Sequence, residues 1–259
     1  LEQLLGSKYV ESELGDIFLK VKEDLLLQKK VLFAGTGCQV NSLHKYIGNH
    51  ENLFLFEILC HGVPSKKLLE LFIKDFERKN NVTIKNIEFR SKEKYGWTPP
   101  TMNIYTNRKK FSDAAYFYSF NRGFGLKYFN RESCFNCPYT YLTTKSDVIV
   151  GDYWNSEEEF YDTLGMSFII LKSSQAEDYF SKIRKKIDYN TISVEQIAEN
   201  NKKLIMPSKK PLDYINFWND FYKHLTYSDL VKKYRINLKL SEKVLKKLNL
   251  FIKKRKTEK

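Results

Sequence analysis

Two apolar segments of this 259-residue chain, residues 30–35 (KVLFAG) and 53–60 (LFLFEILC), have the length and composition of buried strands. A cysteine stands at the end of each strand: Cys38 follows a glycine turn, and Cys60 directly precedes His61. The first strand leads into a segment whose apolar positions repeat at helical spacing, and a second such segment follows the turn after Cys60. Alternating strands and helices are typical of an α/β sheet, in which functional side chains gather where strands end.

Further strands and helices extend this pattern along the chain. We expect strands or hairpins at residues 82–90, 102–113, 146–154 and 166–173, and shorter strands just after residue 7 and around 190–194. The predicted fold is α/β, a mixed sheet with flanking helices and a helical C-terminal appendage. The predicted domains are an α/β domain over residues 1–195 and a helical region over residues 196–259.

The formal net charge of +13 is concentrated near the C-terminus. Residues 240–259 carry seven Lys, one Arg and two Glu, a net +6, on a segment with the apolar spacing of an amphipathic helix. Two interpretations remain open: a peripheral helix with a solvated basic face, or a contact with an anionic membrane surface. Because no nucleic-acid-binding motif accompanies the charge, we expect no nucleic acid partner.

The cellular compartment decides whether cysteines form structural disulfides or serve metal and redox chemistry. The longest apolar runs are far shorter than the roughly 20 residues that cross a bilayer, and the N-terminal residues lack a secretory signal pattern. The chain begins with Leu rather than Met, which indicates a partial polypeptide. We expect a cytoplasmic protein, peripheral to the membrane if the basic tail binds lipid, in which clustered cysteines serve metal or redox chemistry.

The whole thiol inventory is Cys38, Cys60, Cys134 and Cys137. The last two form a C-x-x-C loop followed by Pro138, a pattern found in ferredoxin ligand segments. Four thiolates suit either an iron–sulfur cluster or a closed zinc site. Structural zinc sites generally contain two C-x-x-C pairs, whereas two of these cysteines stand singly, so the pattern favours iron–sulfur over zinc. Ordinary burial of free thiols is the remaining alternative.

Six blocks, in this order, resemble the coenzyme F420 hydrogenase/dehydrogenase beta-subunit family. They are GSKYVES at 6–12, VLFAGTGCQ at 31–39, ILCHGVPS at 58–65, FRSK with Gly96-Trp97, RESCFNC at 131–137 and SDVIVGDYW at 146–154. The blocks extend from the start of the chain to about residue 155, and the CHGVPS and SC-x-x-C segments are specific. The resemblance implies an iron–sulfur flavoprotein, an oxidoreductase or electron-transfer subunit.

The resemblance also implies cofactors, ligands and partners. A 4Fe–4S cluster would be held by Cys38, Cys60, Cys134 and Cys137, beside FAD. Electrons would pass between a ferredoxin or partner redox subunit and a deazaflavin or another two-electron acceptor. The residues implied to line the cluster and flavin pocket are Gly35, Thr36, Gly37, Gln39, His61, Arg90, Lys92, Asp152 and Trp154. Some relatives are encoded in gene clusters for surface polysaccharides.

Two departures from the family pattern matter. The family usually has Pro before the first cysteine, where this chain has Gly37, and we expect the glycine to loosen the position of Cys38. The family's glycine-rich flavin segment precedes the GSKYVES block, so we expect this polypeptide to bind FAD weakly or not at all. The alternative function is a non-catalytic, zinc- or thiol-stabilised accessory module of a polysaccharide-assembly system.

Overall fold

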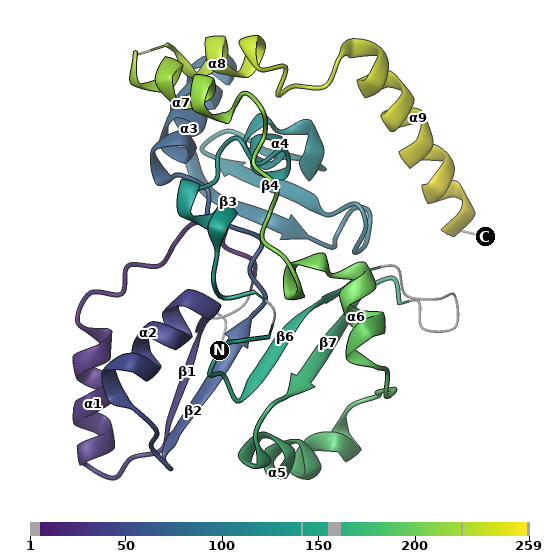
Figure 1. The fold of residues 1–259 in the computed structure, drawn as a ribbon. Helices are drawn as coiled ribbons and strands as arrows, with labels where there is room; N and C mark the ends of the chain where they lie inside the picture. The colour runs from purple at the N-terminus through teal and green to yellow at the C-terminus, as the bar shows by residue number, and fades with distance from the viewer. Residues whose placement is uncertain (1–5, 141, 155–161, 224, 258–259) are drawn as a thin grey trace. The chain divides into compact units, whose positions relative to one another are not determined.

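The computed structural model describes residues 6–140, 142–154, 162–223 and 225–257, with side chains as far as Leu250 (Figure 1). The chain divides into two compact units, each assembled from separate segments. The cysteine unit comprises Ser12–His61 and Ser133–Ser208. The hairpin unit comprises Leu1–Glu11, Gly62–Glu132 and Lys209–Lys259.

The cysteine unit is built on a four-stranded sheet in the order β1-β2-β6-β7. The strands are β1 (Val31–Thr36), β2 (Leu53–Ile58), β6 (Val148–Tyr153) and β7 (Met166–Leu171). β1, β2 and β6 run parallel, and β7 pairs antiparallel with β6, so the sheet is mixed. Alternate residues of β1 and β2 are buried, which explains the apolar sequence of both strands.

Helices cover the sheet at two separate clusters of buried apolar side chains. α1 (Ile17–Leu26) and α2 (Gly37–Ile47) pack onto β1 and β2 through a cluster that includes Val40 and Leu55. α6 (Val194–Asn200) packs onto β6 and β7, where Ile197 meets Ile149 and Phe168. α5 (Ser174–Ile183) follows β7 and begins at Ser173, whose Oγ accepts a hydrogen bond from the Ala176 N–H.

The hairpin unit contains a three-stranded antiparallel sheet in the order β3-β4-β5. Its elements are β3 (Ile84–Ser91), β4 (Thr101–Thr106), β5 (Lys110–Ala114), α3 (Lys66–Asn80), α4 (Ser119–Gly125), α7 (Tyr214–Tyr222), α8 (Tyr227–Lys233) and α9 (Leu240–Thr257). The core is rich in aromatic rings, among them the fully buried Phe120, Phe129 and Phe217. Each such side chain contributes about 2–3 kcal/mol of burial free energy.

These elements confirm the predicted fold class, an α/β protein with a mixed sheet and a helical C-terminal region. The two short strands predicted near residues 7 and 190–194 were wrong. Residues 7–14 have no strand partner, and residues 190–193 form the approach to α6, whose first turn is capped by Ser193. The predicted boundary at residue 195 lies inside α6 and stays a prediction.

Across the described residues, no helix combines the length and the apolar character that a membrane crossing requires.

Candidate metal centre

Strand register places Cys38 and Cys60 in equivalent positions at one edge of the sheet. Thr36 of β1 is the partner of Ile58 in β2, and each cysteine follows two residues later. Neighbouring parallel strands lie about 4.8 Å apart, and their carboxyl ends meet at the same edge. Val150 of β6 is in turn the partner of Ile58, so Asp152 occupies the corresponding position on the third strand. The predicted strand-end positions of these side chains are confirmed.

The first turn of α2 forms a fixed support for Cys38. Thr36 and Gln39 make a capping box, in which Gln39 Oε1 accepts a 3.0 Å hydrogen bond from the Thr36 N–H. Gln39 Nε2 donates to Ser12 Oγ at 3.0 Å, and Thr36 Oγ1 lies 3.2 Å from Cys38 Sγ. The Cys38 side chain is exposed in the first turn of α2.

Gly37 is the point where three segments of the chain meet. A Cβ at this position would lie 2.7 Å from Glu57 Oε1 and 3.2 Å from both Tyr139 Cβ and Thr144 Cγ2. The segment that follows the C-x-x-C loop therefore packs directly against the residue before Cys38. The capping box and these close contacts surround the turn, and the expected loosening by Gly37 stays a prediction.

The C-x-x-C loop brings two further free thiols to the cysteine unit. Cys134 lies in the short helix η3 (Glu132–Asn136), Cys137 follows it, and both are half-buried around the buried ring of Phe135. Burial raises the pKa of Cys137, as do the nearby thiols of Cys38 and Cys134; the Tyr139 N–H and Lys203 act in the opposite direction. The thiols of Cys38 and Cys134 are thus both near enough to Cys137 to act on its pKa.

Buried polar groups attach the loop to the sheet beneath it. Ser146 Oγ donates to the buried Glu57 carboxylate at 2.7 Å, and Thr144 Oγ1 lies 3.1 Å from Ser146 Oγ. Lys172, just after β7, donates from Nζ to the Leu142 and Thr144 carbonyls at 3.1 and 2.5 Å. Burial lowers the pKa of Lys172, and the Glu57 charge opposes that shift.

Asn41 of α2 completes this attachment from the other side. Its Nδ2 donates to the Gly37 carbonyl at 2.8 Å, and its Oδ1 accepts a 3.2 Å hydrogen bond from the Lys145 N–H. The side chain is buried, with 7% of its surface exposed. One amide therefore links the helix that carries Cys38 to the segment that follows Cys137.

Sequence reasoning missed these buried polar residues, although a signal for two of them exists. Glu57 interrupts the apolar strand LFLFEI, and Lys172 directly follows the apolar strand MSFIIL. A charged residue at a strand position that should be buried indicates a partner elsewhere in the fold. Asn41, on a helix of mixed composition, gives no comparable signal.

The other predicted site residues fall into two groups. His61, Asp152 and Trp154 are half-buried residues of the cysteine unit, at or just beyond strand ends. Arg90 and Lys92 belong to the hairpin unit, at the end of β3, where the Arg90 guanidinium lies 5.9 Å from the centre of the Trp97 ring. A joint pocket formed by both groups stays a prediction.

Within the part of the chain that the structure describes, no three Cys, His, Asp or Glu side chains converge tightly enough to enclose a single metal ion. A tetrahedral zinc site with Zn–S distances near 2.3 Å would require sulfurs about 3.8 Å apart. A cube of four irons and four sulfides is larger than one ion, so its cysteine ligands stand farther apart. That the four free thiols of the cysteine unit would hold such a cluster stays a prediction.

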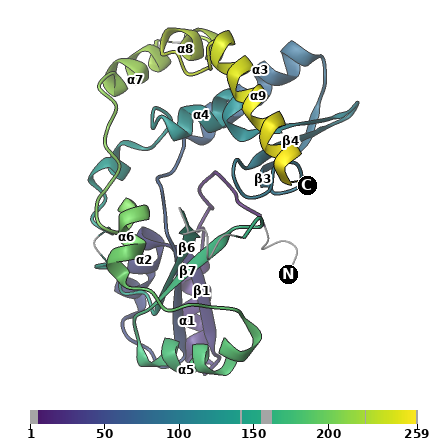
Figure 2. The ribbon, with the colours of Figure 1, turned by 90° about the vertical axis from the view of Figure 1, so that its right-hand side faces the viewer.

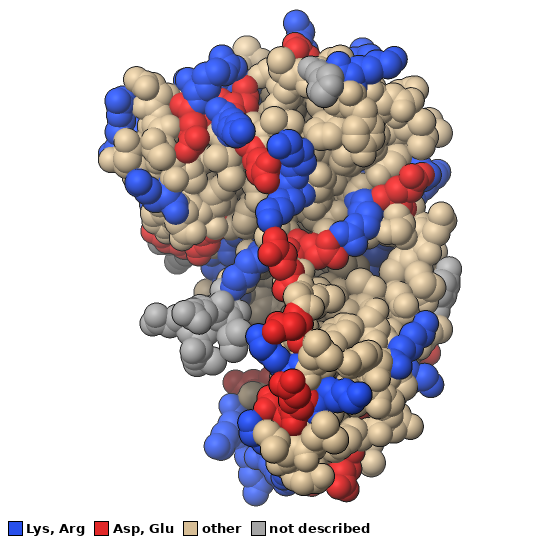
Figure 3. All heavy atoms as spheres, turned by 90° about the vertical axis from the view of Figure 1, so that its left-hand side faces the viewer, with Lys and Arg blue, Asp and Glu red and all other residues tan. Residues whose placement is uncertain are grey.

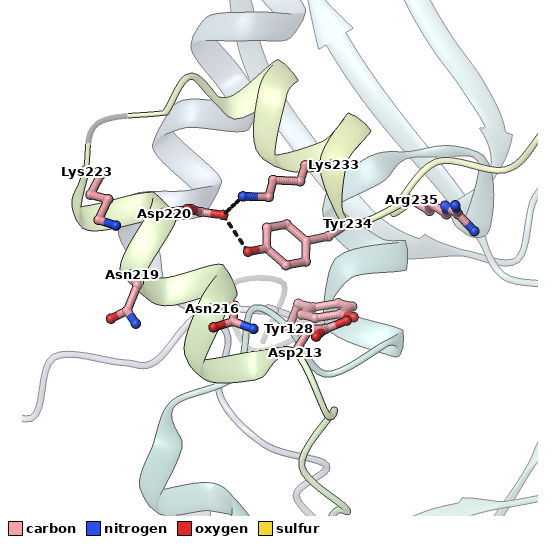
Figure 4. A pocket seen from close by; sticks show the side chains of 9 residues that line it. All are labelled: Tyr128, Asp213, Asn216, Asn219, Asp220, Lys223, Lys233, Tyr234 and Arg235. Atoms are coloured by element: carbon pink, nitrogen blue, oxygen red, sulfur yellow. Dashed lines mark hydrogen bonds and ion pairs between the residues drawn. The ribbon is translucent and has the colours of Figure 1, made fainter.

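A separate polar pocket of about 560 Å³ lies between α7 and α8 in the hairpin unit (Figure 4). Asp220 accepts 2.5 Å hydrogen bonds from Lys233 Nζ and Tyr234 Oη. These bonds lower the pKa of Asp220, while burial followed by the Asp220 interaction raises that of Tyr234. No cysteine lines this pocket, so we assign its polar contacts to packing of α7 against α8.

Charges of both signs are mixed on one face of the molecule (Figure 3), and the absence of a nucleic acid partner stays a prediction. On the face shown in Figure 3, Lys and Arg side chains alternate with Asp and Glu rather than forming one basic surface. Several of these charges form exposed ion pairs, such as Lys29 with Asp24 and Lys67 with Glu70. Such pairs contribute about 0–1 kcal/mol each.

Comparison with known proteins identifies the family. The family model that describes the C terminus of the coenzyme F420 hydrogenase/dehydrogenase beta subunit matches residues 28–197. Among solved structures, the chain is similar to one in a xenon-derivatised F420-reducing [NiFe] hydrogenase complex from Methanosarcina barkeri, with 15% identity and a TM-score of 0.43. That alignment covers 77% of this chain and 67% of the hydrogenase chain. No curated protein sequence gives a significant match.

The matched segment of 170 residues contains all four cysteines and every predicted site residue. It also covers the whole sheet of the cysteine unit and the buried groups that attach the C-x-x-C loop to it. The chain therefore belongs to the family of coenzyme F420 hydrogenase/dehydrogenase beta subunits, through their C-terminal domain.

Proposed function

We propose that this chain is an iron–sulfur electron-transfer subunit of an oxidoreductase. Its cluster would be a 4Fe–4S centre held by Cys38, Cys60, Cys134 and Cys137. The observation that carries the proposal is the convergence of separate cysteine segments on Gly37, whose missing side chain allows Glu57, Tyr139 and Thr144 to approach. Membership of a redox family supports the same conclusion.

The protein side of the mechanism lies in how the thiols are held. The first turn of α2 would hold the Cys38 sulfur in place, with the Thr36 hydroxyl 3.2 Å from it. Phe135, between the two cysteines of the C-x-x-C loop, is buried and would anchor the loop. A rigid ligand set reduces the rearrangement that accompanies each electron transfer, and the attachment of the loop through Glu57 and Asn41 supplies that rigidity.

The proposal also includes a flavin cofactor and redox partner proteins. FAD would lie beside the cluster, near Gly35–Gln39, His61, Asp152 and Trp154. Arg90 and Lys92 of the hairpin unit stay predicted cofactor-binding residues. When bound, the cluster relays single electrons and the flavin combines two of them for hydride transfer. The electron donor would be a ferredoxin or a partner redox subunit, and the acceptor a deazaflavin or similar compound. A cytoplasmic location and a role in surface-polysaccharide synthesis belong to the same proposal.

Metal and sulfide analysis after anaerobic purification tests the proposal. We expect about four irons and four acid-labile sulfides per chain, with a broad absorbance near 400 nm. Stoichiometric zinc without sulfide would overturn it and favour the accessory-module alternative. A flavin measured in the same preparation decides separately whether FAD binds, so a cluster without flavin would leave the iron–sulfur assignment standing.

A further inference from the structure

The C-terminal helix α9 exposes an apolar face that no described residue of its own unit covers. The helix spans Leu240–Thr257, 18 residues and about 27 Å. Four large apolar side chains at helical spacing share one side and are more than half exposed: Leu240 (78%), Val244 (53%), Leu245 (61%) and Leu248 (54%). A helix on the surface of a globular protein normally turns such a face inward.

The side of α9 that meets the hairpin unit is instead largely basic. Lys246 Nζ lies 4.6 Å from the centre of the Tyr116 ring, and Lys247 Nζ lies 5.6 Å from that of Phe117 and 3.7 Å from Asp113 Oδ2. Leu250 is the only described apolar side chain of the helix that is buried. In Figure 2 α9 overlaps the β3-β4 region in projection, and the Lys247–Asp113 pair is its contact with β5. The apolar face therefore points away from the unit that carries it.

Charge distinguishes between the surfaces that could cover this face. Residues 240–257 contain six Lys and one Arg against one Glu, a net +6. A second copy of the chain would bring the same positive charge to a face-to-face contact and would be repelled. An anionic lipid surface attracts the cations and also accepts the leucines between its headgroups. The helix lies beyond the segment matched by the family, so this property is independent of the redox site.

We propose that α9 binds an anionic membrane surface, lying parallel to it with Val244, Leu245 and Leu248 inserted among the headgroups. The hairpin unit covers the opposite side of the helix and leaves the apolar face free to make this contact. The basic sequence KKRK at residues 253–256 would add electrostatic attraction to the lipid phosphates. The protein would thereby be held at the membrane peripherally.

Flotation with lipid vesicles tests the proposal on the full chain. We expect the protein to float with vesicles of phosphatidylcholine and phosphatidylglycerol, and to stay unbound with phosphatidylcholine alone. The double variant Leu245→Ser/Leu248→Ser should reduce the bound fraction at least tenfold. Leu212→Ser, at a fully exposed leucine of the same unit, is the matched control and should bind like the wild type. Circular dichroism verifies that each variant is folded.

Three results would overturn the proposal. The first is failure of the folded wild type to bind anionic vesicles, and the second is equal binding to both vesicle types. The third is a dimer of the wild type in light scattering that the Leu245→Ser/Leu248→Ser variant abolishes, because this face would then be covered by a second copy. None of these outcomes depends on the cluster, so they are distinguishable from a failure of the proposed redox function.

Discussion

Ser146 donates a 2.7 Å hydrogen bond to the carboxylate of Glu57, 89 residues earlier in the chain, and both side chains are buried. Glu57 lies on β2, three residues before Cys60, and Ser146 lies nine residues after Cys137. This bond therefore connects the supports of two proposed ligand segments. It makes the position of the C-x-x-C loop depend on the interior of the sheet.

Removal of the Ser146 hydroxyl should destabilise the protein. Ser146→Ala leaves the buried Glu57 carboxylate without this donor, and hydrogen bonds to charged groups contribute about 1.5–3 kcal/mol. We expect the free energy of unfolding in urea to fall by about that amount. Ser181→Ala is the control, because Ser181 is exposed and its Oγ bonds only to the Asp178 carbonyl of its own helix. Equal effects of the two variants would contradict this role for Ser146.

Lys172→Met should loosen the segment that follows the C-x-x-C loop. It should also lower the free energy of unfolding. The substitution removes the donor to the Leu142 and Thr144 carbonyls and leaves Glu57 without its nearby cation. We expect a loss of about 1–3 kcal/mol in urea unfolding and faster hydrogen exchange in Thr144–Ser146. Lys29→Met removes an exposed lysine paired with Asp24, and should cost less than about 1 kcal/mol. Unchanged exchange in Lys172→Met would show that the loop is held by other groups.

A side chain at Gly37 should disturb the candidate centre. In Gly37→Ala the new Cβ would lie 2.7 Å from Glu57 Oε1, and overpacking of this kind costs about 1–3 kcal/mol. Gly125→Ala is the matched control, because a Cβ added there would have no atom from elsewhere in the described chain within 4 Å. The control should be neutral or stabilising by up to about 1 kcal/mol. If Gly37→Ala is as stable as Gly125→Ala, the packing of the loop against α2 is looser than described.

Tyr95 should make stability fall at alkaline pH. Burial, followed by the charge of Asp113 and the 3.1 Å hydrogen bond to it, raises the pKa of Tyr95 to about 12 from its usual 10.0. Between these values the folded protein retains a proton that the unfolded chain has lost. The contribution is therefore complete below pH 10 and is lost as the pH rises towards 12.

Urea unfolding at several pH values from 9 to 12 measures this contribution. Tyr95→Phe should show a shallower loss of stability over that interval than the wild type. Tyr222→Phe, at an exposed tyrosine of α7, should retain the wild-type slope. A wild-type slope in Tyr95→Phe would mean that other groups dominate the alkaline loss.

Much of the cysteine unit could be predicted from sequence, because its strands are apolar runs that end at a turn or a cysteine. Register in a parallel sheet then brings Cys38 and Cys60 to one edge without further information. The division into two units could not be predicted, since the chain passes between them at residues 11, 61, 132 and 208 without a linker composition. The family resemblance groups Arg90 and Lys92 with the cysteines; these two residues belong to the hairpin unit, and their share in the site stays a prediction.

The polar contacts beneath the loop were also beyond sequence reasoning. Asn41 and Lys145 are 104 residues apart, and Glu57 and Ser146 are 89 apart. Only the folded chain shows that each pair meets, because neither residue type nor spacing identifies a partner at such a separation. The prediction of the short strands was wrong for a related reason. A strand forms only where a neighbouring strand pairs with it, and residues 7–14 pair with no strand in the described part of the chain.

The iron and acid-labile sulfide content of Cys60→Ser, purified anaerobically beside the wild type, tests the central claim most directly. Cys60 follows β2 and is not part of the C-x-x-C pair. A cluster therefore requires Cys60 only if its ligands come from separate segments. The account predicts that Cys60→Ser stays folded by circular dichroism and loses most of the iron, the sulfide and the absorbance near 400 nm. A folded Cys60→Ser protein with the wild-type content of iron and sulfide would contradict it.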